Sequence, residues 1–118
     1  MGSIVNAVCK CGYEKELFIG GGMSNFETVC HFPSYCQNCN DLVQTNLYEK
    51  TVKCPQCKSE KVVAYDQKEL ISKLGMKVVC CWNTFEELGR VIALTNGNYL
   101  CPSCSNNRLK FYKAGNWD

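Results

Sequence analysis

The sequence predicts a small α+β protein that consists mostly of antiparallel strands and forms one compact unit over residues 1–118. Three observations predict this fold class. The chain has 118 residues, about the length of a single domain. It contains 11 cysteines, eight of which fall into four closely spaced pairs. Two segments, residues 52–65 and 99–112, also share one pattern, in which a Cys-Pro-x-Cys turn separates an apolar lead-in from a short strand.

The cysteine content also indicates the compartment. The chain shows no charged segment followed by an apolar one at its amino terminus, and an odd number of cysteines cannot all form disulfides. Lys, Glu or Gly interrupts every hydrophobic run, so no stretch approaches the ~18 consecutive apolar residues that a membrane span needs. We therefore expect a soluble, cytoplasmic protein with reduced thiols and no membrane partner.

Each cysteine pair is predicted to form one tight turn that presents two thiolates. In chain order the four turns carry Cys9 with Cys11, Cys36 with Cys39, Cys54 with Cys57, and Cys101 with Cys104. Strand-like segments follow the turns, over residues 13–19 and 42–48 and in the segments that end at Tyr65 and Tyr112. Four thiolates hold one Zn²⁺ in a closed tetrahedral site, so the eight cysteines predict two structural zinc ions.

The spacing of the turns indicates which of them share a metal ion. Fourteen residues separate the second turn from the third, and this is the shortest connection between any two turns. Short loops close at a lower entropic cost. We therefore favour a nested arrangement, in which the second and third turns form an inner site and the first and fourth turns form an outer site. A sequential arrangement, first with second and third with fourth, uses the same eight ligands and stays open.

The stretch from Tyr35 to Asp66 resembles the zinc β-ribbon superfamily, which includes many transcription and translation factors. The resemblance implies short strands around one Zn²⁺, with the four cysteines of the second and third turns as ligands. The pattern departs from the commonest form, because Asn40 and Lys58 stand where glycine usually follows the second cysteine of a turn. We expect an inner ribbon over residues 32–67 and an outer ribbon formed by residues 7–22 with residues 98–113.

Residues 68–97 are predicted to form an insert of helix and strand. A helix should begin near Asp66, where an acidic cap precedes an apolar stripe, and should end at Gly75. The stripe consists of Leu70, Ile71 and Leu74. The same capping pattern recurs over residues 84–87 and predicts a second short helix.

Glycine marks two further turns. Asn96-Gly97 is typical of a two-residue hairpin turn and predicts that residues 91–94 pair with residues 98–100. Three consecutive glycines at residues 20–22 indicate a turn or a close backbone approach after the first strand-like segment.

Three cysteines lie outside the four turns: Cys30, Cys80 and Cys81. Cys80 and Cys81 are neighbours on a strand-like run, so one should face the core and the other the solvent. Small structural thiols are the simplest interpretation. The alternative is a third metal site that combines Cys30, the single histidine His31, and Cys80 or Cys81.

The ligand set also admits other chemistry. An Fe(Cys)₄ site of the rubredoxin type uses the same four thiolates, and the ribbon resemblance favours zinc over iron. A redox-active dithiol usually lies at a helix start, whereas strands flank these turns. Neither paired carboxylates, nor a nucleophile with its base, nor an open metal position is evident. The sequence therefore predicts a binding protein that is not an enzyme and has no small-molecule substrate.

Two classes of macromolecular partner follow from the surface residues. For nucleic acid, basic side chains cluster near the third turn (Lys50, Lys53, Lys58 and Lys61) and near the fourth turn (Arg108, Lys110 and Lys113). Phe111, Tyr112 and Trp117 would stack on unpaired bases beside the second cluster. For a protein partner, the ribbons would be rigid platforms and aromatic residues such as Trp82, Phe85 and Trp117 would anchor the contact.

Net charge does not decide between these partners. Eight thiolates add eight negative charges and two Zn²⁺ add four positive ones, so the formal charge of +2 becomes −2. Lysines at strand edges also have an ordinary role, since they prevent edge-to-edge pairing.

Overall fold

A computed structural model describes residues 2–21, 28–73, 75–82 and 84–117, without the side chains of Glu87 and Trp117. Gly22, which belongs to the predicted glycine turn, and Leu74, which belongs to the helix predicted from Asp66, lie outside this part of the chain. Every described strand pair is antiparallel, which confirms the mostly antiparallel fold class. No described helix is long and apolar enough to cross a membrane.

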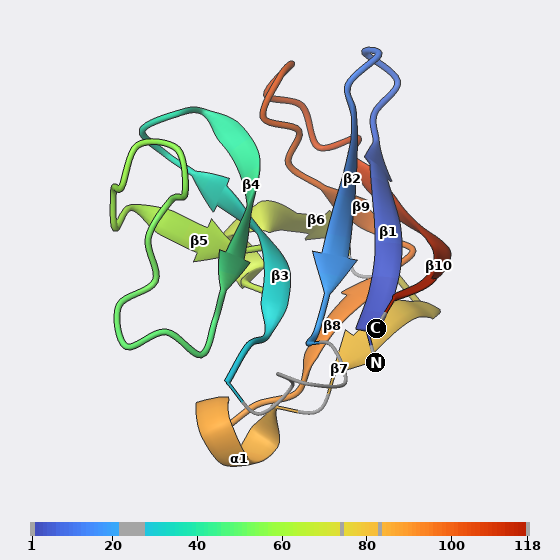
Figure 1. The fold of residues 1–118 in the computed structure, drawn as a ribbon. Coiled ribbons are helices and arrows are strands. Elements are labelled where there is room, and N and C mark those ends of the chain that lie inside the picture. The colour runs from blue at the N-terminus through green and yellow to red at the C-terminus, as the bar shows by residue number, and fades with distance from the viewer. Residues whose placement is uncertain (1, 22–27, 74, 83, 118) are drawn as a thin grey trace.

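The first sheet has the order β10-β1-β2 and joins both ends of the chain (Figure 1). It consists of β1 (Gly2–Val8), β2 (Glu14–Ile19) and β10 (Lys110–Trp117). β1 lies in the centre, with Val5 and Ala7 fully buried on its inner face. No strand was predicted before residue 7, because Ile4 and Val5 are adjacent and only Asn6 separates them from Ala7 and Val8, so apolar and polar residues do not alternate regularly. The partner strands on both sides explain why this segment is extended.

The second sheet has the order β4-β3-β5 and surrounds the second and third cysteine turns. It consists of β3 (His31–Cys36), β4 (Asp41–Asn46) and β5 (Val62–Ala64). Pro33 lies in the central strand and has no N–H to donate. Its carbonyl accepts a hydrogen bond from the Tyr65 amide, and β5 ends one residue earlier, at Ala64. Pro33 therefore limits the length of β5.

A backbone bridge at Gly20 connects the two sheets. Gly20 and His31 exchange two hydrogen bonds of 2.8 Å between their amide nitrogens and carbonyl oxygens. Gly20 has a φ of 85°, and a Cβ at this position would lie 2.5 Å from the Trp82 ring. The predicted close backbone approach after the first strand-like segment is therefore confirmed at Gly20.

Residues 71–99 form two short strand pairs, β6 with β9 and β7 with β8. The bounds are β6 (Ile71–Lys73), β7 (Val78–Trp82), β8 (Ile92–Thr95) and β9 (Asn98–Tyr99). Hydrogen bonds from the Leu100 amide to the Leu70 carbonyl and from the Asn96 amide to the Lys77 carbonyl continue the pairing between these strands. The four strands are thus the two arms of one long, irregular hairpin.

The helix predicted between Asp66 and Gly75 is reduced to a single 3₁₀ turn, η1 (Lys68–Leu70). Its continuation after Leu70 was wrong, because Ile71 starts β6 opposite Tyr99. Pairing with β9 overrides the local helical pattern, because it provides hydrogen bonds and places Leu70 in the core. The second short segment is helical for one turn, α1 (Phe85–Leu88), and ends at Gly89.

The hairpin predicted at Asn96-Gly97 was also wrong, because β8 and β9 do not pair with each other. Residues 96 and 97 instead form a bend within one arm of the long hairpin. A Cβ on Gly97 would lie 1.9 Å from the Lys73 carbonyl oxygen, and one on Gly75 would lie 2.2 Å from Asn96 Oδ1. Gly97 therefore allows the two arms of the hairpin to come into close contact.

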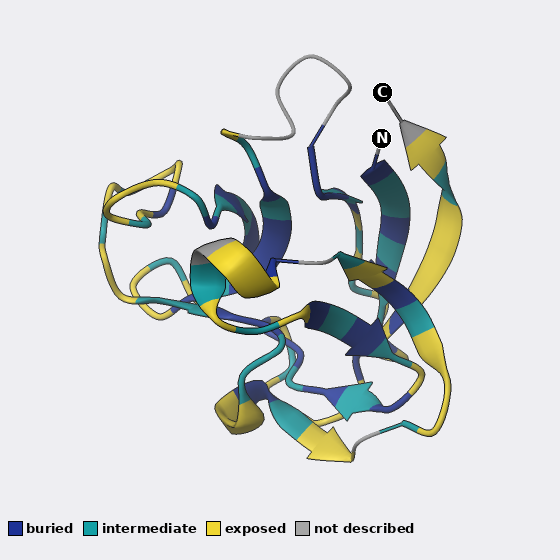
Figure 2. Cartoon of the chain, turned by 90° about the horizontal axis from the view of Figure 1, so that it is seen from below, coloured by how far each residue is buried: buried dark blue, intermediate teal, exposed yellow. Residues whose placement is uncertain are grey.

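All four sheets contribute to one main hydrophobic core. Its centre is formed by Tyr65, Tyr99 and Phe111, whose rings meet edge to face with centroids 5.0 to 6.1 Å apart. Figure 2 shows that buried residues recur along the strands, whereas α1 is largely exposed. Phe111 is therefore a core residue, and the prediction that it stacks on nucleic-acid bases was wrong.

Candidate metal centres

The structure brings the eight cysteines of the four turns together in two groups. The inner site consists of Cys36, Cys39, Cys54 and Cys57, and the outer site of Cys9, Cys11, Cys101 and Cys104. Within each group the four Sγ atoms lie within 4.8 Å of one another. These groups correspond to the second turn with the third and the first turn with the fourth.

The sulfur–sulfur distances fit a tetrahedral metal ion. A Zn–S bond of ~2.3 Å requires sulfurs about 3.8 Å apart at the corners of a regular tetrahedron. In the inner site, Sγ of Cys36 lies 3.6 Å from that of Cys57, and Sγ of Cys39 lies 3.8 Å from that of Cys54. In the outer site, both closest pairs are 3.7 Å apart. A disulfide would need about 2.05 Å, so the geometry suits metal ligation.

A similar backbone reversal closes all four turns, although the first turn has one residue between its cysteines and the other three have two. In each turn the amide of the residue after the second cysteine donates to the carbonyl of the first cysteine, at distances between 2.8 and 3.0 Å. This residue has a positive φ in every case: Gly12, Asn40, Lys58 and Ser105. The left-handed conformation reverses the chain so that both thiols point to one side. Glycine is thus used at only one of the four positions.

Backbone amides also point at the sulfurs of the inner site. The Cys39 amide donates to Cys36 Sγ at 3.3 Å, and the Gln56 amide donates to Cys54 Sγ at 3.4 Å. Such donors stabilise negative charge on a ligating thiolate. The turn therefore supplies both the ligands and part of the electrostatic environment that a metal thiolate needs.

In each site, neighbouring groups and burial raise the pKa of one thiol and lower the pKa of another. Hydrogen bonding with the Asn38 side chain lowers the pKa of Cys57 to about 6, whereas the hydrogen bond with Cys57 raises the pKa of Cys39 to about 12. In the outer site a backbone amide lowers the pKa of Cys104 to about 7, and burial raises that of Cys101 to about 12. Four thiolates in such a small volume repel one another, so a divalent cation is needed to ionise all four.

The remaining cysteines do not join these groups. Cys80 is buried and its neighbour Cys81 is exposed, which confirms the predicted alternation along β7. Cys30 is fully buried in the main core. Among the described residues, neither Cys30, His31, Cys80 nor Cys81 belongs to a group of three or more potential ligands. The alternative of a third site receives no support from the described part of the chain.

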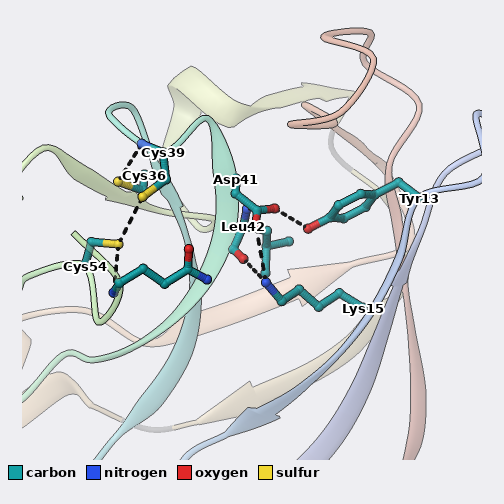
Figure 3. A network of polar contacts seen from close by, with 8 residues as sticks. Tyr13, Lys15, Cys36, Cys39, Asp41, Leu42 and Cys54 are labelled. Carbon is teal, nitrogen blue, oxygen red and sulfur yellow. Dashed lines mark hydrogen bonds and ion pairs between the residues drawn. The ribbon is translucent and has the colours of Figure 1, made fainter.

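Polar contacts connect the segment after the second turn, in the inner site, to the segment after the first turn, in the outer site (Figure 3). Tyr13 follows the first turn, and its hydroxyl donates to Asp41 Oδ1 at 2.8 Å. Lys15 Nζ donates to the Leu42 carbonyl at 2.7 Å and lies 3.6 Å from Asp41 Oδ2. Asp41 begins β4 directly after the second turn. Sequence reasoning missed this link, because it joins residues about 28 positions apart whose proximity no local pattern indicates.

The basic residues predicted to contact nucleic acid are all exposed. They belong to the loops and strand ends near the third turn, Lys50, Lys53, Lys58 and Lys61, and near the fourth, Arg108, Lys110 and Lys113. Tyr112 is also exposed, whereas Trp82 is half-buried above Gly20. The Trp117 side chain lies outside the described structure.

Comparisons with protein-family models, with curated proteins and with solved structures find no match to this chain. The functional interpretation of the two cysteine groups therefore rests on their geometry and chemistry.

Proposed function

We propose that this protein is a binding module stabilised by two structural Zn²⁺ ions, and that it is not an enzyme. One observation carries the proposal: eight thiols, delivered by four turns that each close with a left-handed residue, converge in two groups with tetrahedral spacing. Zn²⁺ would hold four thiolates together in each group and contribute folding free energy directly. With four protein ligands, each coordination sphere is closed and leaves no position for substrate.

The proposed architecture is two nested zinc ribbons. Residues 32–67 would form the inner ribbon, and residues 7–22 with 98–113 the outer one, with residues 68–97 between their last two turns. The grouping of Cys36, Cys39, Cys54 and Cys57 supports this arrangement over the sequential one. The proposed role of the metals is mechanical, since each fixes two loops whose exposed side chains can then contact another macromolecule.

Metal counting tests the zinc proposal. Native mass spectrometry of protein purified without chelator should show two zinc ions per chain. In this loaded protein only one thiol, Cys81, should react rapidly with a maleimide, because the other unligated cysteines are buried. A chelator should make further thiols reactive, and Cys81→Ser should remove the fast reaction before chelation. One metal per chain would contradict the proposal, as would an iron absorption spectrum at full occupancy.

A second candidate function, a protein adaptor without nucleic-acid binding, is favoured by exposed apolar side chains at and beside α1. Phe85 in α1 is 63% exposed, and Val91 is 52% exposed. The Thr84 hydroxyl donates to the Arg90 carbonyl at 2.6 Å, which holds the chain before Val91 next to the start of α1. A photo-crosslinking amino acid at residue 85 would test this candidate in cells. Repeated capture of one protein by the metal-loaded chain, and its loss with a Val91→Ser variant, would support the adaptor. Capture that does not depend on Val91 would count against it.

A further inference from the structure

A small pocket lies where the bend of the long hairpin meets the start of β10. Its volume is about 280 Å³, and its polar lining consists of Lys73, Asn96, Asn98 and Lys110. Lys73 ends β6 and Lys110 begins β10, so two lysines almost forty positions apart line the same pocket. The pocket contains none of the eight cysteines of the two metal sites.

The charge of this pocket is not balanced by the protein. No carboxylate lines it, and the ion pairs among the described residues involve Lys15 and Arg90 instead. Glu14 and Glu16 lie on β2, two strands from β10 in the sheet and thus about 10 Å away. Two ammonium groups beside one small cavity repel each other unless an anion lies between them.

Two side-chain amides add hydrogen-bond donors. Asn96 Oδ1 accepts a hydrogen bond from the Lys77 amide at 3.2 Å, which leaves its Nδ2 group as a donor. The Asn98 side chain makes no hydrogen bond with another described residue. Gly75 and Gly97 permit the close packing that fixes this bend, because neither position has room for a Cβ. The backbone that carries these donors is therefore held in place by this packing.

We propose that this pocket binds a phosphate group, held by the ammonium groups of Lys73 and Lys110 and by the amides of Asn96 and Asn98. A phosphate offers several acceptor oxygens and a negative charge, which matches four donors without a protein carboxylate. This inference rests on the proposed role as a binding module, and it specifies the chemistry that the module would recognise.

The surface beside the pocket suits a phosphate that belongs to a single-stranded nucleic acid. Tyr112 is 54% exposed and lies two residues after Lys110 on β10, so both side chains project from the same face of the strand. An aromatic ring at this spacing can stack on an unpaired base while the neighbouring lysine contacts the backbone. Free inorganic phosphate is the other source of the same chemistry.

Amide chemical shifts and binding isotherms of the full-length, metal-loaded protein test the site. Inorganic phosphate and a ten-nucleotide oligouridine should each shift the amide signals of residues 73, 75 and 96–98. The variant Lys73→Gln/Lys110→Gln should weaken oligouridine binding about tenfold and lower the salt dependence of log K by about 0.7 for each phosphate that the variant no longer neutralises. Tyr112→Ala should weaken oligouridine binding by a similar factor without affecting phosphate, and Tyr112→Phe should have little effect.

A matched control is Lys10→Gln/Lys68→Gln, which removes the same charge from exposed positions outside the pocket and outside both predicted basic clusters. If both double variants weaken binding equally, the attraction is nonspecific and the proposal is overturned. It is also overturned if neither phosphate nor oligouridine shifts the pocket amides. Phosphate shifts with no effect of the pocket variant on oligouridine would support the site but assign it to a free phosphate group. Zinc is counted separately, so failure of the metal proposal would be recognised independently.

Discussion

The inner and outer sites each consist of four cysteine thiols from two turns that close with a left-handed residue, but they differ in how much chain separates the two turns. In the inner site the paired sulfurs of Cys36 and Cys57 are 21 positions apart. In the outer site the paired sulfurs of Cys9 and Cys104 are 95 positions apart. Closing the inner site requires ordering of one short segment, whereas closing the outer site requires almost the entire chain to be in place.

The two sites also differ in what surrounds them. Cys36 and Cys54 form a small separate cluster with Val43, whereas Cys9 and Cys101 belong to the main hydrophobic core. A local metal site can therefore stabilise a loop region, while a long-range site stabilises the fold as a whole. Four experiments would test this difference between the two sites.

The largest effect is expected from the loss of one ligand in the outer site. Cys101→Ser should abolish cooperative folding of sheet β10-β1-β2, because a structural zinc contributes ~10–16 kcal/mol and a domain of this size is stable by only about 5–15 kcal/mol. Cys54→Ser should disorder sheet β4-β3-β5 more than the first sheet. Two-dimensional NMR spectra and thermal unfolding would measure both effects.

Cys81→Ser is the control for these variants, since the exposed thiol should be replaceable within about 0.5 kcal/mol. Cys30→Ser should be intermediate at about 1–3 kcal/mol, because it buries a hydroxyl in the core. A loss of the first sheet in Cys54→Ser as complete as in Cys101→Ser would contradict the proposed difference between the sites.

A fragment of residues 31–67 should separate the inner site from the rest of the protein. It contains all of β3, β4 and β5 and all four inner ligands, so one Co²⁺ should bind with the intense absorption of a tetrahedral four-thiolate site. The fragment should be less stable than the same region in the full chain, because Phe32, Leu42 and Tyr65 pack in the main core. A fragment of residues 1–41, which holds half of each site, should stay unfolded with cobalt; an ordered metal complex there would argue for the sequential arrangement.

The link between the two sites should have a smaller effect. Tyr13→Phe removes the hydroxyl that donates to Asp41 and should reduce the free energy of unfolding by about 1–2 kcal/mol. A double-mutant cycle with Asp41→Asn would measure the coupling, and competition with a chelator would show whether metal affinity changes at both sites. Purely additive free energies would mean that the sites are energetically independent despite this contact.

The smallest expected effect concerns the left-handed residues of the turns. Lys58, in the inner site, has a φ of 65°, and Ser105, in the outer site, has a φ of 60°. Substitution of either by glycine should stabilise the protein by about 0.5 kcal/mol, since relief of backbone strain exceeds the added entropy of the unfolded chain. Gly12→Ala should do the opposite by about 1 kcal/mol, because its φ is 100° although the space around it is free. Denaturant unfolding would measure all three, and a loss of stability in Lys58→Gly would contradict the role assigned to this backbone angle.

The four cysteine turns could be predicted from the sequence because each turn is a local structure. The spacing of Cys36 and Cys39 places both thiols on one bend, the same spacing recurs in the third and fourth turns, and Cys9 and Cys11 are one residue closer together. The opposite orientations of Cys80 and Cys81 were predictable for the same reason, since alternation along a strand is a local property. By contrast, Ile71 was predicted on the apolar side of a helix and lies in β6, because β9 was available as a partner.

Local sequence was sufficient to predict the four cysteine turns and the strand-rich character of the chain, because both depend on spacings of a few residues. The tertiary structure decided which turns meet, that Phe111 fills the core rather than the surface, and that Gly97 bends an arm of the long hairpin. It also brought Lys73 beside Lys110 and Tyr13 beside Asp41. These contacts depend on which strands pair across long stretches of chain, and that choice is made by burial and hydrogen bonding summed over the whole molecule.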